Sequence, residues 1–376
     1  MSAIYKKLEE VCEILDSRRV PITAKNRKTG IYPYYGANGL QDYVAEYIFD
    51  DELVLLAEDG GNFGSKERPI AYRVSGKCWV NNHAHVLKAK PLVNADYLCY
   101  ALMFYDTEGL VNGATRQKLT QTAMRQMMIP YRNMTEQLQI ADEINQVIRL
   151  IDKRKEELSL LDQLVKSRFI ELFGDMYLNS LEWTEVSLES ISDIVSGITK
   201  GRKIKTAELR EVPYMAVSNV KNGYIDWTTV KTIEVTEQEL NQYRLLPDDV
   251  LMTEGGDPDK VGRGAIIREP LENCIHQNHI FRVRFNERDI LPVFFAEYLQ
   301  HQRAKRYFFG CAKQTTGIAS INMKQLRNLP VLMPPLELQR QFAAFVAQTD
   351  KSKLAVEKSL KHLEILKKSL MQQCFG

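Results

Sequence analysis

The chain has 376 residues, long enough for two domains of ordinary size, and 44% of them are hydrophobic while 26% are charged. No stretch approaches the roughly 18 uncharged apolar residues of a membrane span, so we expect no membrane association. The net charge of +2 neither requires nor excludes a nucleic-acid partner, and the six cysteines lack CxxC spacing. Scattered cysteines favour reduced thiols and a cytoplasmic location over a disulfide framework.

In chain order, a first domain is expected at residues 1–133. This segment is rich in Tyr, Gly and Asn and in alternating apolar residues, as in "EYIFDDELVLLAEDGG" (46–61). Such a pattern predicts short strands and loops. Residues 177–333 have the same character, as in "HIFRVRF" (279–285), and are expected to form a second domain of the same kind.

A long helix is expected after each domain, at residues 134–176 and 334–376. Apolar residues recur in both segments at a spacing close to 3.5, and charged runs fill the other faces, which is typical of coiled-coil helices. Pro130 precedes the first helix, and Gly174 stands where a glycine commonly ends one. The positions assigned to the apolar seam are Ile144, Ile148, Ile151, Leu158, Leu161, Val165, Phe169, Phe342, Val346, Val356, Leu360, Leu363 and Leu370.

The two halves of the chain repeat one another. The stretch "LDQLVKSRFIELFG" (161–174) matches the end of the chain, "LEILKKSLMQQCFG", at a shift of 202 residues, and a shift of 196 places Glu58 on Glu254. A further alignment, of residues 119–127 with 318–326, uses a shift of 199. Matches in the same order indicate duplication. We therefore expect an α+β protein with two similar domains, whose two long helices pack antiparallel and give the chain a nearly two-fold symmetry.

Catalytic motifs are missing from the sequence. It has no Gly-x4-Gly-Lys-[Ser/Thr] loop for ATP, no [Asp/Asn/Ser]-Pro-Pro-aromatic motif of amino-methyltransferases, and no Asp or Glu two positions before a lysine, as many nucleases have. Glu58 and Glu254 could be one catalytic acid used twice. We favour the alternative, that they accept backbone N–H bonds in a tight Gly-Gly turn, and we predict no catalytic residue in this chain.

Two groups of Cys and His residues resemble ligand sets. Their members are Cys78, His83 and His85 in the first half and Cys274, His276 and His279 in the second. Zinc would need four ligands in each domain. At the shift of 196, His85 falls on Phe281 and His276 falls on Val80, so the additional ligands are not shared. We favour a buried strand that carries the cysteine and ends in an Asn-His pair, and we predict no metal.

Basic residues concentrate in loops that also contain Gly, Thr and Asn, at related positions in both halves. Lysine and arginine neutralise phosphates, while arginine, glutamine and asparagine can also contact base edges. Solvated loops often have this composition, but its recurrence in both halves favours DNA. The stretch "YPYYGANG" (32–39) could read bases or could be a turn with packed tyrosines. The candidate DNA-binding residues are Asn38, Lys66, Arg68, Arg116, Lys118, Lys200, Arg202, Lys203, Lys205, Asn219, Lys260, Arg263, Lys313, Gln314, Thr315 and Thr316.

The order of these segments resembles that of the specificity subunits of type I restriction-modification systems. The resemblance covers essentially the whole chain and is carried by "YPYYGANG", "LLAEDGGN", "LMTEGGDPDKVGRG", "CIHQNHIFRVR", "TRQKLTQTAM" and "TTGIASINMKQLRNLPVLMPPLELQ", and by two helices that end in "FG". It implies two target-recognition domains, each of which reads one half of a split site in double-stranded DNA, and two helical spacers that act as a ruler.

The same resemblance implies the partners. Two methyltransferase (modification) subunits would bind along the helices, and restriction subunits would join them in phage defence. S-adenosylmethionine, ATP and magnesium would belong to those partners, so no cofactor is expected in this chain. The first half has "AEDGGNFGSKERP" where the second has "TEGGDPDKVGRG", so the two domains are expected to read different half-sites.

Two other classes of function remain as alternatives. One is a coiled-coil scaffold that joins two proteins without a role on DNA, which the basic loops oppose and salt-dependent DNA retention would test. The other is a stand-alone nuclease, which the missing motifs oppose and metal-dependent cleavage would test.

Overall fold

The computed structural model describes residues 4–113, 116–202, 208–257, 261–286, 288–315 and 318–376. The chain divides into two compact units, and each is described here by itself. Unit 1 contains residues 1–156 and 357–376, and unit 2 contains residues 157–356. Among the described residues, no helix combines the length and the apolar character that a membrane crossing requires.

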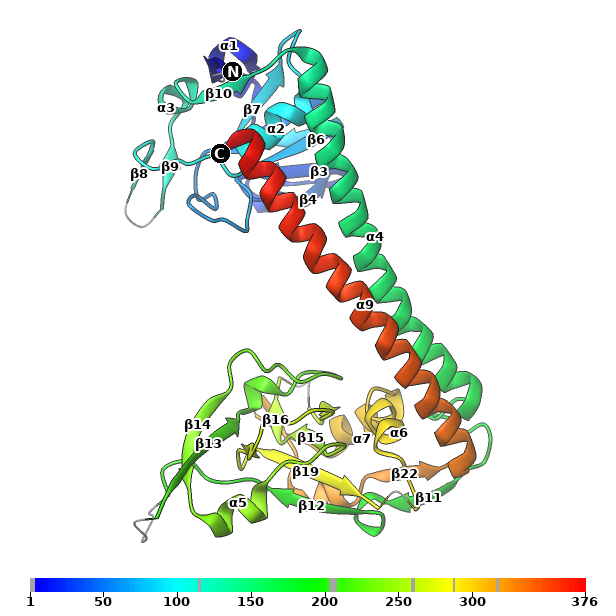
Figure 1. Ribbon diagram of the computed structural model, residues 1–376. Helices are drawn as coiled ribbons and strands as arrows, with labels where there is room; N and C mark the ends of the chain where they lie inside the picture. Colours follow the sequence, from blue (N-terminus) through cyan, green and yellow to red (C-terminus); the bar gives the residue numbers. More distant parts are fainter. Residues whose placement is uncertain (1–3, 114–115, 203–207, 258–260, 287, 316–317) are drawn as a thin grey trace. The chain divides into compact units, whose positions relative to one another are not determined.

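Unit 1 is built on a six-stranded sheet (Figure 1). In order across the sheet, its strands are β2 (Cys12–Ile14), β7 (Ala84–Ala89), β5 (Phe49–Ala57), β6 (Ala71–Val80), β3 (Thr29–Gly36) and β4 (Gly39–Val44). The second half of the central strand β5 is apolar, and its residues Leu53 to Ala57 are completely buried, as expected for a strand covered on both faces. Helix α2 (Ala95–Met103) packs on β5 and β6 and begins at Asn94, whose Oδ1 accepts the Tyr97 N–H at 2.9 Å.

Shorter elements complete unit 1. Strand β1 pairs with β10, and β8 pairs with β9, both antiparallel. The bounds of these elements and of the short helices are β1 (Ile4–Lys7), α1 (Leu8–Val11), η1 (Asp16–Arg18), η2 (Ala24–Asn26), β8 (Val111–Asn112), β9 (Lys118–Leu119), α3 (Gln121–Arg125) and β10 (Met128–Tyr131).

Unit 2 has the same kind of framework with shorter strands. Its four-stranded sheet has the order β12 (Ser192–Ser196), β19 (Ile280–Phe285), β15 (Val250–Thr253) and β17 (Gly264–Ile266). Smaller sheets are formed by β14 (Lys231–Val235), β13 (Arg210–Met215) and β18 (Ile275–His276), by β16 (Gly255–Gly256), β21 (Ile318–Ser320) and β20 (Lys313–Thr315), and by β11 (Thr184–Ser187) with β22 (Pro330–Met333). The short helices are η3 (Leu188–Ser190), η4 (Val217–Asn219), α5 (Glu237–Tyr243), α6 (Pro292–Tyr298), α7 (Gln302–Cys311) and α8 (Met323–Arg327).

The strand registers repeat at the predicted shift of 196 residues. Val54 faces Leu87 in unit 1, and Val250 faces Val283 in unit 2. The duplication inferred from the sequence is therefore present in the backbone pairing. Both units also combine antiparallel strand pairs with a parallel pair. The parallel pair is β3 with β6 in unit 1 and β13 with β18 in unit 2.

The predicted alignment of residues 119–127 with 318–326 is wrong by three positions. The Leu119 N–H donates to Glu58 O at 2.8 Å, and the Ile321 N–H donates to Glu254 O at 2.8 Å, so the equivalent residues are 202 apart. Thr120 and Asn322, also 202 apart, cap α3 and α8. The matching Met-basic-Gln letters favoured the shorter shift, but the caps and the backbone bonds fix the true register.

The two long helices are α4 (Met134–Phe173) and α9 (Leu336–Phe375), and each contains 40 residues. In unit 1, Ala141 and Ile144 of α4 share a buried cluster with Met371 of α9. In unit 2, the Phe169 ring lies 5.3 Å from the Phe342 ring. The start of each helix thus packs with the end of the other, which confirms the predicted antiparallel pairing.

The predicted seam positions are all buried or half-buried. Seven are buried: Ile144, Ile151, Val165, Phe169, Phe342, Val346 and Val356. The half-buried ones are Ile148, Leu158, Leu161, Leu360, Leu363 and Leu370. The predicted end of the first helix is also confirmed, because Gly174 has φ +72° and its N–H donates to Ile170 O at 2.8 Å. The predicted segments 134–176 and 334–376 each contribute to both units.

Candidate nucleic-acid interface

The chain bends after the central strand of each unit at a pair of glycines, Gly60 and Gly61 or Gly255 and Gly256, and we call this segment the Gly-Gly turn. The predicted basic segments lie near it. The Glu58 N–H donates to His83 O at 2.9 Å, and the Glu254 N–H donates to His279 O at 3.0 Å. In unit 1, the Gly60 N–H also donates to Gln117 O at 3.0 Å, so the Gly-Gly turn lies beside the segment that carries Arg116 and Lys118. In unit 2, β16 pairs with β21, and β21 pairs with β20, which carries Lys313.

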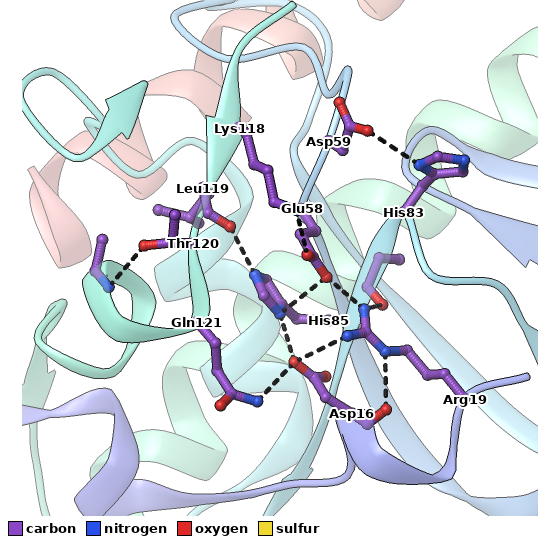
Figure 2. A network of polar contacts seen from close by, with 12 residues as sticks. Asp16, Arg19, Glu58, Asp59, His83, His85, Lys118, Leu119, Thr120 and Gln121 are labelled. Atoms are coloured by element: carbon purple, nitrogen blue, oxygen red, sulfur yellow. Dashed lines mark hydrogen bonds and ion pairs between the residues drawn. The ribbon is translucent and has the colours of Figure 1, made fainter. Parts of the chain in front are cut away.

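A buried group of charges lies under the turn of unit 1 (Figure 2). The ring of His85 is completely buried, with Nδ1 2.6 Å from Asp16 Oδ2 and Nε2 2.9 Å from Leu119 O. Each ring nitrogen of His85 therefore faces a hydrogen-bond acceptor. Burial would raise the pKa of Asp16, but the hydrogen bond and the charge of His85 outweigh burial and lower this pKa below its ordinary value.

The side chain of Glu58 joins this group from the turn. Its carboxylate lies 2.6 Å from Arg19 Nη1 and 3.2 Å from Lys118 Nζ. Glu254, its equivalent in unit 2, instead pairs with His279. The prediction that the two carboxylates accept backbone N–H bonds is therefore wrong: the backbone N–H of each glutamate donates in the turn, and its carboxylate pairs with side chains, Arg19 and Lys118 for Glu58 and His279 for Glu254.

The two predicted Cys and His groups do not form ligand sets. Cys78 and Cys274 are completely buried, and burial raises the pKa of each thiol to about 12. The buried His276 lies between the carbonyl oxygens of Tyr243 and Val195. Within the described ranges, the one group of possible metal ligands is Asp16, Glu58 and His85, whose ligand atoms lie within 4.8 Å of one another. Arg19 and Lys118 already neutralise these carboxylates, so the cluster is a salt-bridge network.

Arg116 is the most exposed of the basic residues around the turn of unit 1. Its side chain is 60% exposed, and its Nε lies 2.5 Å from Asp59 Oδ1. The other oxygen of Asp59 is 3.3 Å from His83 Nδ1 (Figure 2), and Asn38 Nδ2 donates to Gly60 O at 3.1 Å. Three of the predicted residues, Asn38, Arg116 and Lys118, therefore lie around one turn.

The tyrosines of "YPYYGANG" favour the packing alternative. Tyr34 is buried, its ring lies 4.1 Å below the Arg27 guanidinium, and its hydroxyl donates to Ile22 O at 3.3 Å. The half-buried Tyr32 packs on Tyr47 with 5.0 Å between ring centroids. Asn38, at the end of this stretch, is exposed.

The other predicted residues are distributed more widely. Lys66, Arg68, Lys200 and Lys313 are exposed, and Arg263 is half-buried. Gln314 and Thr315 belong to β20. Lys203, Lys205, Lys260 and Thr316 lie outside the described residues.

Two predicted DNA contacts of unit 2 are used inside the protein. Asn219 is completely buried: its Oδ1 accepts the Ala216 N–H at 2.9 Å, and its Nδ2 donates to Asp226 O at 2.9 Å. The prediction for Asn219 is wrong, because its amide closes a turn. Arg202 forms a bidentate ion pair with Glu239, in which Nε donates to Oε1 at 2.5 Å and Nη2 donates to Oε2 at 2.7 Å. These hydrogen bonds lower the pKa of Glu239 to about 2.

Sequence reasoning missed Asp16, Arg19 and Asp59. Asp16 and Arg19 belong to "DSRR" (16–19), which reads as an ordinary charged loop, and they meet His85 only through the fold. Asp59 is the neighbour of Glu58, which the sequence repeat picks out, but its partner Arg116 is 57 positions away. The two adjacent acidic residues in "AEDGG" are the signal that could have indicated a role for Asp59.

Comparison with known proteins identifies the family. Residues 4–160 and 180–365 match the profile described as the type I restriction modification DNA specificity domain. The chain belongs to this specificity family. A specificity subunit of Haemophilus influenzae is 26% identical over 98% of this chain and 94% of its own length, and the EcoKI specificity subunit of Escherichia coli is 21% identical over 86% of this chain and 74% of its own.

Solved structures of the specificity family share the fold. The S subunit from M. genitalium aligns with a TM-score of 0.59 and 16% identity, over 100% of this chain and 97% of that one. The two matched segments of the family profile correspond to the two halves of the duplication, so each half of the chain contains one recognition domain. The predicted α+β architecture of two recognition domains with long helices is confirmed.

Proposed function

We propose that this chain is the DNA-recognition subunit of a type I restriction-modification complex and reads a bipartite target. The observation that carries the proposal is the repeated Gly-Gly turn with exposed basic side chains near it. In unit 1 these are Arg116 and Lys118 on the adjoining segment, and in unit 2 it is Lys313, one strand further away. Membership of the specificity family supplies the chemical context. The chain selects the sequence, while partner subunits methylate adenine and cut DNA.

The long helices support the split form of the target. A helix of 40 residues at about 1.5 Å per residue spans roughly 60 Å. At about 3.4 Å per base pair, this length sets an upper bound of about 18 base pairs between the centres of the two half-sites. The glutamates of the two turns have different partners: Glu58 pairs with Arg19 and Lys118, while Glu254 pairs with His279. Because the two turns differ, the two half-sites differ in sequence.

The helices also offer a symmetric surface for partners. Leu164 and Leu366, which are equivalent in the repeat, are 48% and 45% exposed. Exposed leucines at equivalent positions suit two copies of one partner, and we assign them to two modification subunits. Restriction subunits join this assembly. S-adenosylmethionine, ATP and magnesium serve those partners, and the complex works in the cytoplasm.

The test is a methylation map. The chain is produced together with its modification subunit in cells that lack other adenine methylation, and methylated adenines are located by single-molecule sequencing. The expected result is one motif made of two short sequences separated by a gap of fixed length. A continuous motif would contradict the bipartite reading, and unmethylated DNA together with no salt-dependent retention of the chain on DNA would favour the scaffold alternative.

A further inference from the structure

An exposed arginine is usually free to change rotamer, but the guanidinium of Arg116 has two neighbouring side chains that hold it, Asp59 and His83. Asp59 Oδ1 lies 2.5 Å from its Nε, and His83 Nδ1 lies 3.4 Å from its Nη2. The guanidinium also lies near Gly60, which has φ +68° and where an added Cβ atom would stand 3.3 Å from Arg116 Nε. Glycine therefore suits this turn both for its left-handed backbone and for the space that the guanidinium needs.

The backbone that carries Arg116 is also fixed. Gln117 O accepts the Gly60 N–H at 3.0 Å, and the Leu119 N–H donates to Glu58 O at 2.8 Å. Leu119 O accepts from the buried His85 at 2.9 Å (Figure 2). The segment is thus attached to the charged group in the core of unit 1, and Arg116 projects from a rigid support.

The guanidinium N–H groups of Arg116 that Asp59 does not use indicate which kind of ligand this residue can bind. A guanidinium has five N–H groups in a planar fork, and Asp59 uses the one on Nε. Within the described ranges, the bonds of the guanidinium are those of Nε and Nη2, and the side chain as a whole is 60% exposed. Two parallel N–H donors match a pair of neighbouring acceptors, which guanine presents in the major groove as O6 and N7. Because the side chain is already ordered, binding costs little further rotamer entropy.

We infer that Arg116 reads a guanine in the half-site bound by unit 1 and that Asp59 is the positioning residue which orients it. The inference rests on the proposed function and names one readout residue of its first recognition domain. Unit 2 has no counterpart, since the position equivalent to Asp59 is Gly255 and the position equivalent to Arg116 is Ile318. The guanine contact therefore belongs to one half-site only.

The experiment compares methylation motifs of complexes reconstituted with the modification subunit. The variants are Arg116→Ala, Arg116→Lys and Asp59→Asn. The control is Arg268→Ala, which removes another exposed arginine that pairs with an aspartate, Asp248, at 2.9 Å in unit 2. Each Arg116 variant is expected to lose about 10- to 100-fold of the discrimination for guanine at one position of one half-site. The other half-site and the gap should stay as in the wild type, and Arg268→Ala should leave the whole motif unchanged.

Asp59→Asn separates positioning from simple stabilisation. It should relax the same position as Arg116→Ala, and the double variant should relax it no further, because Asp59 acts through Arg116. A purely structural role for Asp59 would lower the melting temperature without changing the motif, and that result would overturn the assignment of Asp59.

Three results would overturn the inference about Arg116. A uniform loss of binding at every sequence, with a smaller salt dependence and an unchanged motif, would identify a phosphate contact. A wild-type motif without guanine in either half-site would exclude the proposed ligand. A wild-type complex that methylates no defined motif would refute the proposed function itself, whereas a defined motif that the Arg116 variants leave intact would refute only the role of Arg116.

Discussion

Gln137 and Gln339, which are 202 residues apart, make the same hydrogen bonds at the starts of α4 and α9. Gln137 Oε1 accepts the Asn94 N–H at 2.9 Å, and Gln339 Oε1 accepts the Leu291 N–H at 2.8 Å. Each Nε2 donates to a carbonyl just before its helix, Arg132 O or Pro334 O, at 2.8 Å. Both side chains are completely buried. Each amide therefore connects the first turn of a long helix to the residue just before a shorter helix on the sheet: Asn94 before α2, or Leu291 before α6.

Replacing either glutamine by alanine should lower the free energy of unfolding by about 2–3 kcal/mol, because buried backbone groups would lose their partners. The matched control is Gln139→Ala, since Gln139 lies on the exposed side of α4 and its Nε2 donates to Glu143 on the same helix at 3.0 Å. Urea unfolding monitored by circular dichroism measures the difference. Equal stabilities of Gln137→Ala and Gln139→Ala would contradict this role.

A second prediction concerns the aromatic contacts of α4 in unit 2. The ring of Phe169 is completely buried and lies 4.8 Å from Phe173, 5.4 Å from Phe294 and 5.3 Å from Phe342. Phe169→Ala should cost about 3–5 kcal/mol in unfolding free energy, since it leaves a cavity among these rings. Ile170→Ala is the control, because the adjacent side chain is 52% exposed and its loss should cost less than about 1 kcal/mol. Similar unfolding midpoints for the two variants would show that the rings do not hold this end of α4.

The sequence predicted those elements whose signal is periodic and local. Val165 and Phe169 follow the heptad of α4 and are buried, because a helix must bury its apolar stripe. Strand β5 lies in a segment that was expected to form short strands, although its buried residues Leu53 to Ala57 are consecutive and do not alternate. The duplication was visible at Glu58 and Glu254, whose backbone bonds repeat in the structure.

The parts that could not be predicted depend on contacts between distant residues. The partners of His85 are Asp16 and Leu119, which are 69 and 34 positions away, and no local pattern links them. Asn219 has the composition of a recognition loop, yet its amide is used inside a turn, because exposure cannot be read from residue type. For the same reason, the sequence did not separate Arg116, which projects into solvent, from Arg202, which is paired with Glu239.

The third prediction is a pH dependence of stability. His276 is completely buried, and burial lowers its pKa to about 4, although the carbonyls of Val195 and Tyr243 act in the opposite direction. An unfolded histidine has a pKa of about 6.5, so between these two values the unfolded chain binds a proton that the folded chain does not. Stability should therefore fall as pH falls from about 6.5 towards about 4, with a contribution from this residue of about 3 kcal/mol at most.

His276→Gln removes this proton-binding group and keeps a donor for one carbonyl. Unfolding free energies of both proteins are measured in urea at pH 7.5, 6.0 and 5.0. The wild type should lose more stability than the variant over this range. Parallel curves would mean that His276 takes up its proton equally in both states.

The last prediction concerns the partner surface of the long helices. Leu164 belongs to unit 2 and Leu366 to unit 1, yet the repeat makes them equivalent, and each has about half of its surface exposed. If each receives one modification subunit, Leu164→Asp and Leu366→Asp should each remove one subunit from the complex, and the double variant should remove both. A buried carboxylate without a partner is costly at an interface, while the same carboxylate facing water leaves the free chain folded.

Native mass measurement of the reconstituted complex counts the subunits. Gln163→Asp is the control for the added charge, since Gln163 is the exposed neighbour of Leu164 and its replacement should leave two modification subunits bound. Circular dichroism checks that all variants keep their helices. A wild-type complex with a single modification subunit would contradict the symmetric surface. So would full occupancy in the double variant, because the partners would then bind elsewhere on the chain.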